Sequence, residues 1–272
     1  MSAQTGRRLR RSIPIAFLLA LAVALLLGPS SASAITYGVP DGDGHPGVGA
    51  LVAEFNGQKD WLCTGTLISP TVFLTAAHCT AYLQSIGITD VWVTFDPMFD
   101  AQKGTFVHGE MHPNPGYNQR ASDPGDMAVI VLDVPQPSRP LAQLPTAGQF
   151  DLMAAKNGLK GQTFRAVGYG SQQTMHTTGR PFFGPGGTRM TSVSTFDAIT
   201  KAWLRLSGNP AKGDGGTGYG DSGGPNYLGE TNVIAGLTVT GDTMCRATNV
   251  IYRLDTPVAR AFLSQFPDVT LP

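Results

Sequence analysis

The apolar residues of this chain occur in short runs that glycines and prolines separate. The 272 residues include 34 Gly and 20 Pro, and the runs between them are rich in β-branched and aromatic residues. Glycine and proline interrupt regular structure and favour turns, so this pattern predicts many short strands joined by turns. The expected strands cover residues 49–55, 63–68, 72–76, 91–95, 105–108 and 127–132, then 162–168, 190–196, 202–207, 232–240 and 250–254.

A proline-rich segment divides these strands into two groups. Residues 135–145 hold four prolines, at positions 135, 137, 140 and 145. Proline continues neither a central strand nor a helix interior. We therefore predict that 135–145 connects two halves, 35–134 and 146–272.

One helical pattern is evident near the C-terminus, over residues 256–266. Thr256 can cap the first turn of such a helix with its hydroxyl, and Pro257 suits the first helical position. This is the one helix that we expect in the mature chain.

The first 34 residues have the composition of a secretory signal peptide. Four arginines precede an apolar run over 13–27, and small residues follow at 32–34. A helix that spans a bilayer needs about 20 apolar residues, more than this run offers, so a retained membrane anchor is the weaker alternative. We expect cleavage before Ile35 and secretion of residues 35–272 into the extracellular space.

The expected mature chain is mildly acidic. The leader holds four arginines and no acidic residue, so the rest of the chain has 15 basic and 19 acidic residues, a net charge of −4. Such a chain has no electrostatic attraction for nucleic acids or anionic membranes. We therefore expect neither nucleic acid nor membrane as a partner after signal cleavage.

Three segments carry residue types that together support acyl transfer. They are Leu74-Thr75-Ala76-Ala77-His78-Cys79, the apolar run that Asp126 opens, and Gly220-Asp221-Ser222-Gly223-Gly224-Pro225. A serine hydroxyl is a weak nucleophile at neutral pH, so it needs an imidazole that takes its proton and a carboxylate that orients the imidazole. Asp123 is the competing carboxylate, but only Asp126 leads directly into the apolar run. His78, Asp126 and Ser222 are therefore the candidate catalytic residues.

These motifs resemble those of the chymotrypsin/trypsin-like serine peptidases, the S1 family, from about Ile35 to the C-terminal helix. In that family the histidine follows Thr-Ala-Ala and precedes a disulfide cysteine, and the serine lies in Gly-Asp-Ser-Gly-Gly-Pro. The resemblance implies an all-β fold of two six-stranded antiparallel Greek-key barrels with a C-terminal α-helix. Residues 35–272 would form one peptidase domain, with His78 and Asp126 from the first barrel and Ser222 from the second.

The resemblance also implies roles for residues around the triad. The amides of Gly220 and Ser222 would form an oxyanion hole, and Asp221 would pair with the new N-terminal ammonium of Ile35. Cys63 and Cys79 would form the disulfide of the histidine loop. Cys245 would then lack its usual partner, because Gly218 stands at the position where relatives carry the second cysteine.

The primary substrate pocket departs from that of relatives that cleave after Arg or Lys. Those relatives have an aspartate six residues before the nucleophile, where this chain has Gly216, and the nearest acid on that side is Asp214. A buried cation without a partner is costly. A pocket lined by Gly216, Thr217, Thr240 and Gly241 is therefore expected to take apolar or modest-sized side chains, and a shifted Asp214 that binds a basic one is the alternative.

Other function classes share some of these sequence features. Gly220-x-Ser222-x-Gly224 also fits the nucleophile elbow of α/β-hydrolases, but that fold places its histidine after the serine, and all five histidines here precede Ser222. A catalytically weak or inactive secreted homologue that acts as a binding module is the remaining alternative. We expect a serine endopeptidase that acts on polypeptides as a monomer, with no cofactor and no metal.

Overall fold

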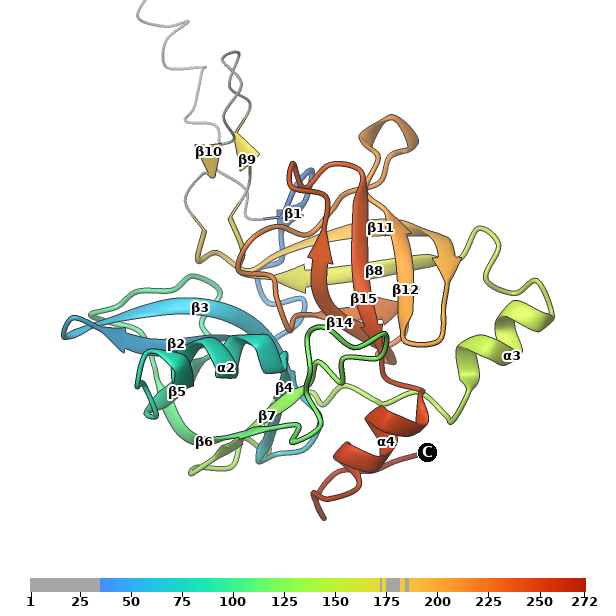
Figure 1. Cartoon of the computed structure of the whole chain (residues 1–272). Helices are drawn as coiled ribbons and strands as arrows, with labels where there is room; N and C mark the ends of the chain where they lie inside the picture. Colours follow the sequence, from blue (N-terminus) through green and yellow to red (C-terminus); the bar gives the residue numbers. More distant parts are fainter. Residues whose placement is uncertain (1–34, 172, 175–181, 184–185) are drawn as a thin grey trace, which may run out of the picture. The chain divides into compact units, whose positions relative to one another are not determined.

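The structure is a computed structural model, and it describes residues 35–171, 173–174, 182–183 and 186–272. The predicted signal peptide, residues 1–34, lies outside the described residues. Most described strands belong to two antiparallel barrels (Figure 1).

The first barrel is closed, in the strand order β2-β3-β4-β7-β6-β5. Every neighbouring pair is antiparallel, and β2 pairs with both β3 and β5. Its strands are β2 (Val48–Phe55), β3 (Gln58–Leu67), β4 (Val72–Thr75), β5 (Val91–Thr94), β6 (Val107–Pro113) and β7 (Ala128–Leu132).

The second barrel repeats this strand order, as β8-β11-β12-β15-β14-β13, and β8 closes it by pairing with both β11 and β13. The expected fold of two six-stranded antiparallel barrels is therefore confirmed. The strands are β8 (Thr163–Gly168), β11 (Met190–Ile199), β12 (Trp203–Ser207), β13 (Pro225–Leu228), β14 (Ile234–Gly241) and β15 (Thr248–Arg253). A short β1 (Val39–Pro40) pairs with the start of β11, and β9 (Gln173–Thr174) pairs with β10 (Phe182–Phe183).

Each barrel has its own apolar core, and a third cluster joins them. Buried side chains of the third cluster come from the first barrel, such as Val48 and Leu74, and from the second, such as Val167 and Leu237. Burial of apolar surface is the main driving force of folding, so this shared cluster holds the two barrels against each other. The interface between them is where the candidate site lies.

Three α-helices accompany the barrels in the described part of the chain, where we expected one. They are α2 (Ala77–Ser85), α3 (Gln149–Ala155) and α4 (Pro257–Leu263). The expectation for α4 holds: the Thr256 hydroxyl accepts a hydrogen bond from the Ala259 N–H, and Pro257 occupies the first turn. None of the described helices has the length and hydrophobicity that a bilayer-spanning helix requires.

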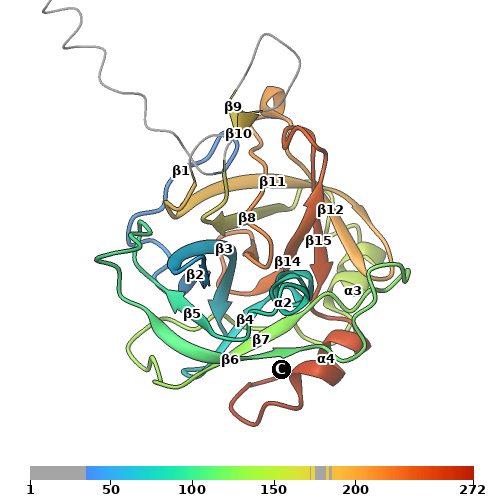
Figure 2. The ribbon, with the colours of Figure 1, turned by 60° about the vertical axis from the view of Figure 1, so that its left-hand side comes forward.

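The expectation of a single helix was wrong. One of the unexpected helices, α2, carries His78. Figure 2 shows this helix nearly end-on, and residues of α2 and β14 line one pocket.

Candidate active site

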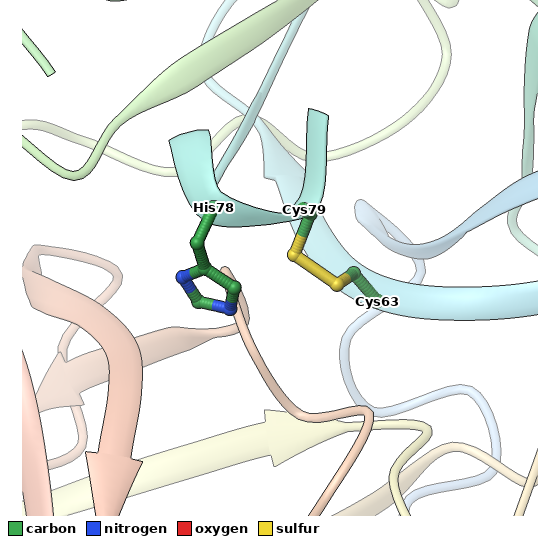
Figure 3. Close-up of side chains that lie close together, drawn as sticks. All are labelled: Cys63, His78 and Cys79. Carbon is green, nitrogen blue, oxygen red and sulfur yellow. A yellow bond between two sulfur atoms is a disulfide. The ribbon is translucent and has the colours of Figure 1, made fainter. Parts of the chain in front are cut away.

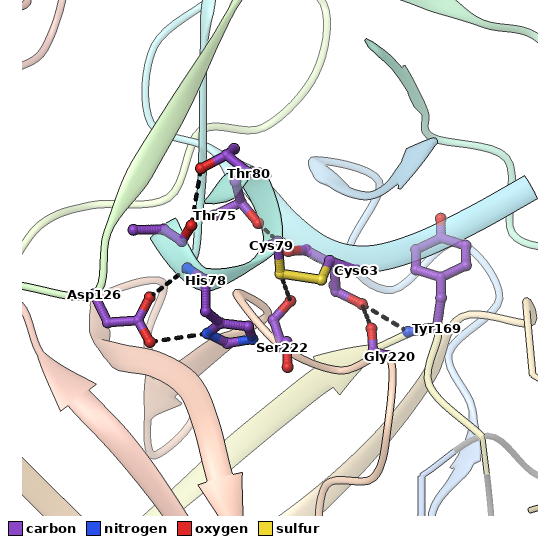
Figure 4. Close-up of a disulfide and its surroundings, with 11 residues drawn as sticks. Cys63, Thr75, His78, Cys79, Thr80, Asp126, Tyr169, Gly220 and Ser222 are labelled. Atoms are coloured by element: carbon purple, nitrogen blue, oxygen red, sulfur yellow. Dashed lines mark hydrogen bonds and ion pairs between the residues drawn. A yellow bond between two sulfur atoms is a disulfide. The ribbon is translucent and has the colours of Figure 1, made fainter. Parts of the chain in front are cut away.

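The pairing of β4 with β7 brings His78 and Asp126 together. Thr75 at the end of β4 lies opposite Ala128 at the start of β7, so the residues just outside both strands are neighbours. The Asp126 carboxylate accepts from His78 twice, from the ring Nδ1 at 2.8 Å and from the backbone N–H at 2.9 Å (Figure 4). Asp126 is buried, so water competes little for these bonds.

Ser222 lies in the turn before β13, and it lines the same pocket as His78. Its side chain is drawn beside the His78 ring in Figure 4. Within the described residues, the Ser222 hydroxyl makes no hydrogen bond with that ring. Hydrogen bonds of catalytic groups are often long in the absence of substrate and tighten when it binds.

The turn that carries Ser222 requires glycine at position 220. Gly220 has φ +96°, a left-handed conformation that costs glycine little, and a Cβ there would collide with the Trp61 ring. Among the described residues, the N–H groups of Gly220 and Ser222 donate to no protein acceptor. Both are available to an oxygen of a bound molecule.

Asp221 is fully buried between these two residues. Its carboxylate accepts backbone hydrogen bonds from Gly218 at 2.7 Å and Gly170 at 2.8 Å. Burial raises the pKa of Asp221 to about 7, and the two hydrogen bonds offset only part of this effect. No cation pairs with Asp221 in the described part of the chain.

Ile35, the predicted partner of Asp221, is also fully buried, against Ala166 and Met190. The next residue, Thr36, pairs with Gly216 through two backbone hydrogen bonds of 3.0 Å. In the full chain the nitrogen of Ile35 is a peptide amide rather than an ammonium group. The predicted ion pair with Asp221 therefore concerns a chain that begins at Ile35.

A pocket of about 360 Å³ opens beside His78 and Ser222. Three predicted pocket residues line it: Thr217, Thr240 and Gly241. Gly216 is not among the lining residues. Lining residues that the sequence did not single out include Leu62, Tyr82, Tyr219, Thr238, Val239 and Asp242.

Asp214 also lies outside the pocket lining. It is 4% exposed, and its carboxylate accepts from the Thr195 hydroxyl at 2.7 Å. The alternative of a shifted Asp214 that contacts a basic side chain in the pocket has no support in this arrangement.

Behind the pocket runs a chain of buried polar side chains. The Thr217 hydroxyl donates to Asn249 at 2.8 Å, Asn249 to Asn226 at 2.9 Å, and Asn226 to the Thr238 hydroxyl at 2.9 Å. Each asparagine is fully buried and satisfied by its neighbours, which fixes the walls of the pocket. No sequence pattern pointed to these asparagines.

Cys63 and Cys79 form a disulfide, as the family resemblance implies (Figure 3). The two sulfurs and His78 lie close enough together to hold a metal ion, but sulfurs bonded to each other are not thiolate ligands. We therefore assign no metal site to this cluster.

Cys245 is a buried free thiol in the pocket wall. A Cβ built on Gly218 would lie 3.8 Å from its sulfur, so the residue at the expected partner position is indeed its neighbour. Burial, together with the charge of Asp242, raises the pKa of the Cys245 thiol to about 11. The thiol form is therefore the stable one at neutral pH.

Comparison with known proteins identifies the family and a similar fold. Residues 44–263 match the model of the trypsin family. A solved structure of HL collagenase is similar, with a TM-score of 0.59 and 17% sequence identity, over 86% of this chain and 95% of that chain. At this identity the similarity concerns the fold alone. No curated protein matches the sequence. Because the family model covers most of the sequence, the chain belongs to the trypsin family of serine peptidases.

Proposed function

We propose that the protein is a secreted serine endopeptidase that cleaves polypeptides through an acyl-enzyme intermediate. The observation that carries this proposal is the pair of hydrogen bonds from His78 to the buried Asp126 carboxylate, in a pocket that Ser222 also lines. A nucleophile, a base and an orienting carboxylate at one site are the requirements of this chemistry.

In the proposed reaction, the Ser222 Oγ attacks the carbonyl carbon of the scissile bond while His78 Nε2 takes the hydroxyl proton. Asp126 keeps the other ring nitrogen protonated and stabilises the imidazolium that forms. His78 then gives the proton to the leaving amine, and the peptide bond breaks. Water attacks the acyl-enzyme in the same way and releases the acid, which restores Ser222.

The oxyanion of each tetrahedral intermediate would be held by the N–H groups of Gly220 and Ser222, which have no acceptor among the described residues. Such preorganised donors stabilise charge that develops in the transition state.

The proposed mature enzyme begins at Ile35, after removal of residues 1–34, and needs no separate activation peptide. Its new ammonium group would pair with the Asp221 carboxylate. Two observations support this pairing. Asp221 is buried without a cation among the described residues, and Ile35 is fully buried beside Ala166, while the next residue, Thr36, pairs with Gly216. The barrels would span 35–134 and 146–272, joined by 135–145.

The proposed primary specificity is for uncharged side chains. Thr217, Thr240 and Gly241 line the pocket and carry no charge, while Asp214 is turned into the protein to meet Thr195. Asp242 also lines the pocket, but its carboxylate is engaged by the N–H groups of residues 246–248. A basic side chain would thus find no dedicated partner.

The test is labelling of the secreted protein by a fluorophosphonate probe, with Ser222→Ala as the matched control and intact mass recorded for both. We expect labelling of the wild type alone, on a chain that begins at Ile35. Absence of labelling on a folded wild-type chain would contradict the proposal and favour the inactive binding homologue instead. Cleavage profiles of a peptide library then test the specificity.

A further inference from the structure

Thr64 is a fully buried residue of β3 that contacts the nucleophile turn from the opposite barrel. It follows Cys63, whose disulfide leads to the helix of His78. Although 156 residues separate Thr64 from Gly220, the Thr64 hydroxyl donates to the Gly220 carbonyl at 2.9 Å. Gly220 is drawn in Figure 4 together with Tyr169, the other partner of this hydroxyl.

The hydroxyl of Thr64 donates one hydrogen bond and accepts another. It accepts from the N–H of Tyr169 at 3.0 Å, and a hydroxyl has only one proton, which goes to Gly220. Tyr169 is itself fixed, because its ring is buried and its hydroxyl donates to the Asp96 carbonyl at 2.7 Å. The Thr64 side chain therefore links a rigid point of the second barrel to the nucleophile turn.

The backbone of Thr64 holds the same turn at a second place. Its N–H donates to the Ser222 carbonyl at 2.9 Å, and its carbonyl accepts from the Thr75 hydroxyl at 2.7 Å. One residue thus fixes the carbonyl groups of both Gly220 and Ser222. Peptide units are planar, so these two hydrogen bonds fix the orientation of the Gly220–Asp221 and Ser222–Gly223 peptide planes. The Ser222 N–H belongs to the Asp221–Ser222 peptide, which lies between these two planes.

We propose that Thr64 is a positioning residue for the oxyanion hole: its hydroxyl holds the Gly220 carbonyl so that the N–H groups of Gly220 and Ser222 converge on one point. This inference rests on the proposed peptidase function. The Trp61 ring supports the same turn by packing against Gly220, so β3 holds Gly220 both by contact and by a hydrogen bond.

The test compares three variants on one peptide substrate. Thr64→Val keeps the shape of the side chain but leaves the Gly220 carbonyl and the Tyr169 N–H without their partner. Thr64→Ser restores the hydroxyl. Thr66→Val is the matched control, because Thr66 is a buried threonine of the same strand whose hydroxyl contacts the Gly47 carbonyl and Tyr227, away from the turn.

We expect kcat of Thr64→Val to fall about 10- to 100-fold with KM within about twofold of wild type, because misplaced donors weaken transition-state binding and leave ground-state binding unchanged. Thr64→Ser should recover most of the rate, and Thr66→Val should stay near wild type. An unchanged kcat in Thr64→Val, or an equal fall in Thr66→Val, would overturn the inference.

Amide hydrogen exchange of residues 218–224 gives a readout that does not depend on activity. We expect faster exchange in this segment for Thr64→Val and not for Thr66→Val, at equal global stability. Unchanged exchange would overturn the positioning role. A wild type that fails to react with the fluorophosphonate would contradict the proposed function alone, and the exchange result would still decide the role of Thr64.

Discussion

At the scale of single residues, the site depends on which of two nearby carboxylates reaches His78. Asp126 accepts from both the ring and the backbone of His78, whereas Asp123 accepts from the Tyr252 hydroxyl at 2.7 Å. Both acids are close in sequence, and the difference follows from the place of Asp126 just before β7. The sequence argument that only Asp126 leads into an apolar strand selects the same residue.

Asp126→Asn should reduce kcat by about 10⁴-fold with little change in KM, the size seen in the trypsin example of this substitution. The introduced side-chain amide would donate a hydrogen bond to an unprotonated His78 Nδ1 and so stabilise the tautomer whose Nε2 carries the proton and cannot accept that of serine. Steady-state kinetics on a peptide ester would measure the effect. Asp123→Asn is the control and should retain activity, and equal loss in both variants would refute the assignment.

The buried Asp214 provides a second prediction at this scale. One of its oxygens accepts from Thr195, and the other has no hydrogen-bond partner among the described residues. Because Asp214 does not line the pocket, Asp214→Asn should leave the ratio of kcat/KM for Arg and Leu at the primary position within about twofold of wild type. A selective loss of cleavage after Arg would instead show that Asp214 contacts the substrate.

At the scale of elements, apolar runs between turn residues located eleven strands of the barrels: β2 to β8, β11, β12, β14 and β15. The bounds were wrong for β3, which begins at Gln58 rather than at residue 63, and for β6, which covers Val107–Pro113 rather than 105–108. The same reasoning missed β13, which begins at Pro225 directly after the nucleophile turn and has only four residues. It also missed α2, because no side chain caps its N-terminus and its apolar face is small. Tertiary contacts, including the disulfide to β3, stabilise α2 where local sequence does not.

Removal of that disulfide tests its contribution to the two elements. The cross-link closes a loop with a sequence separation of 16, for which chain entropy predicts a loss of about 3 kcal/mol in the free energy of unfolding. Cys63→Ala/Cys79→Ala should therefore unfold at a lower guanidinium concentration than wild type. Cys245→Ala, which removes the free thiol, should shift the midpoint much less. Equal shifts in the two proteins would mean that the cross-link contributes no special stability.

At the scale of the whole molecule, the site exists only when both barrels meet. His78 and Asp126 come from one barrel and the Ser222 turn from the other, and Thr64 links the two through Gly220 and Tyr169. The motifs around His78, Asp126 and Ser222 and their order in the sequence were sufficient to name the three catalytic candidates. The bond from Thr64 to Gly220 could not, because it joins residues 156 positions apart and depends on how the barrels pack.

The buried Asp221 links processing of the chain to its stability. In a chain that retains residues before Ile35, burial raises the pKa of Asp221 from an ordinary value of 3.8 to about 7. Between these values the folded state holds a proton that the unfolded state has released, so the free energy of unfolding falls as pH rises through this range. The contribution of the protonated Asp221 carboxyl to the free energy of unfolding is fully present below about pH 4 and lost above about pH 7.

A chain that begins at Ile35 should not show this loss, because the proposed ammonium partner stabilises the ionised carboxylate and lowers its pKa. We expect urea unfolding at pH 5 and pH 7.5 to show an extra fall of roughly 2 to 4 kcal/mol in a chain that retains Ser33 and Ala34, relative to one that begins at Ile35. Asp221→Asn in the extended chain should remove the difference, since the amide does not titrate. If the free energy of unfolding changes equally with pH in both chains, the Ile35 ammonium does not reach Asp221. Cleavage of the Ala34–Ile35 bond would then not organise the nucleophile turn.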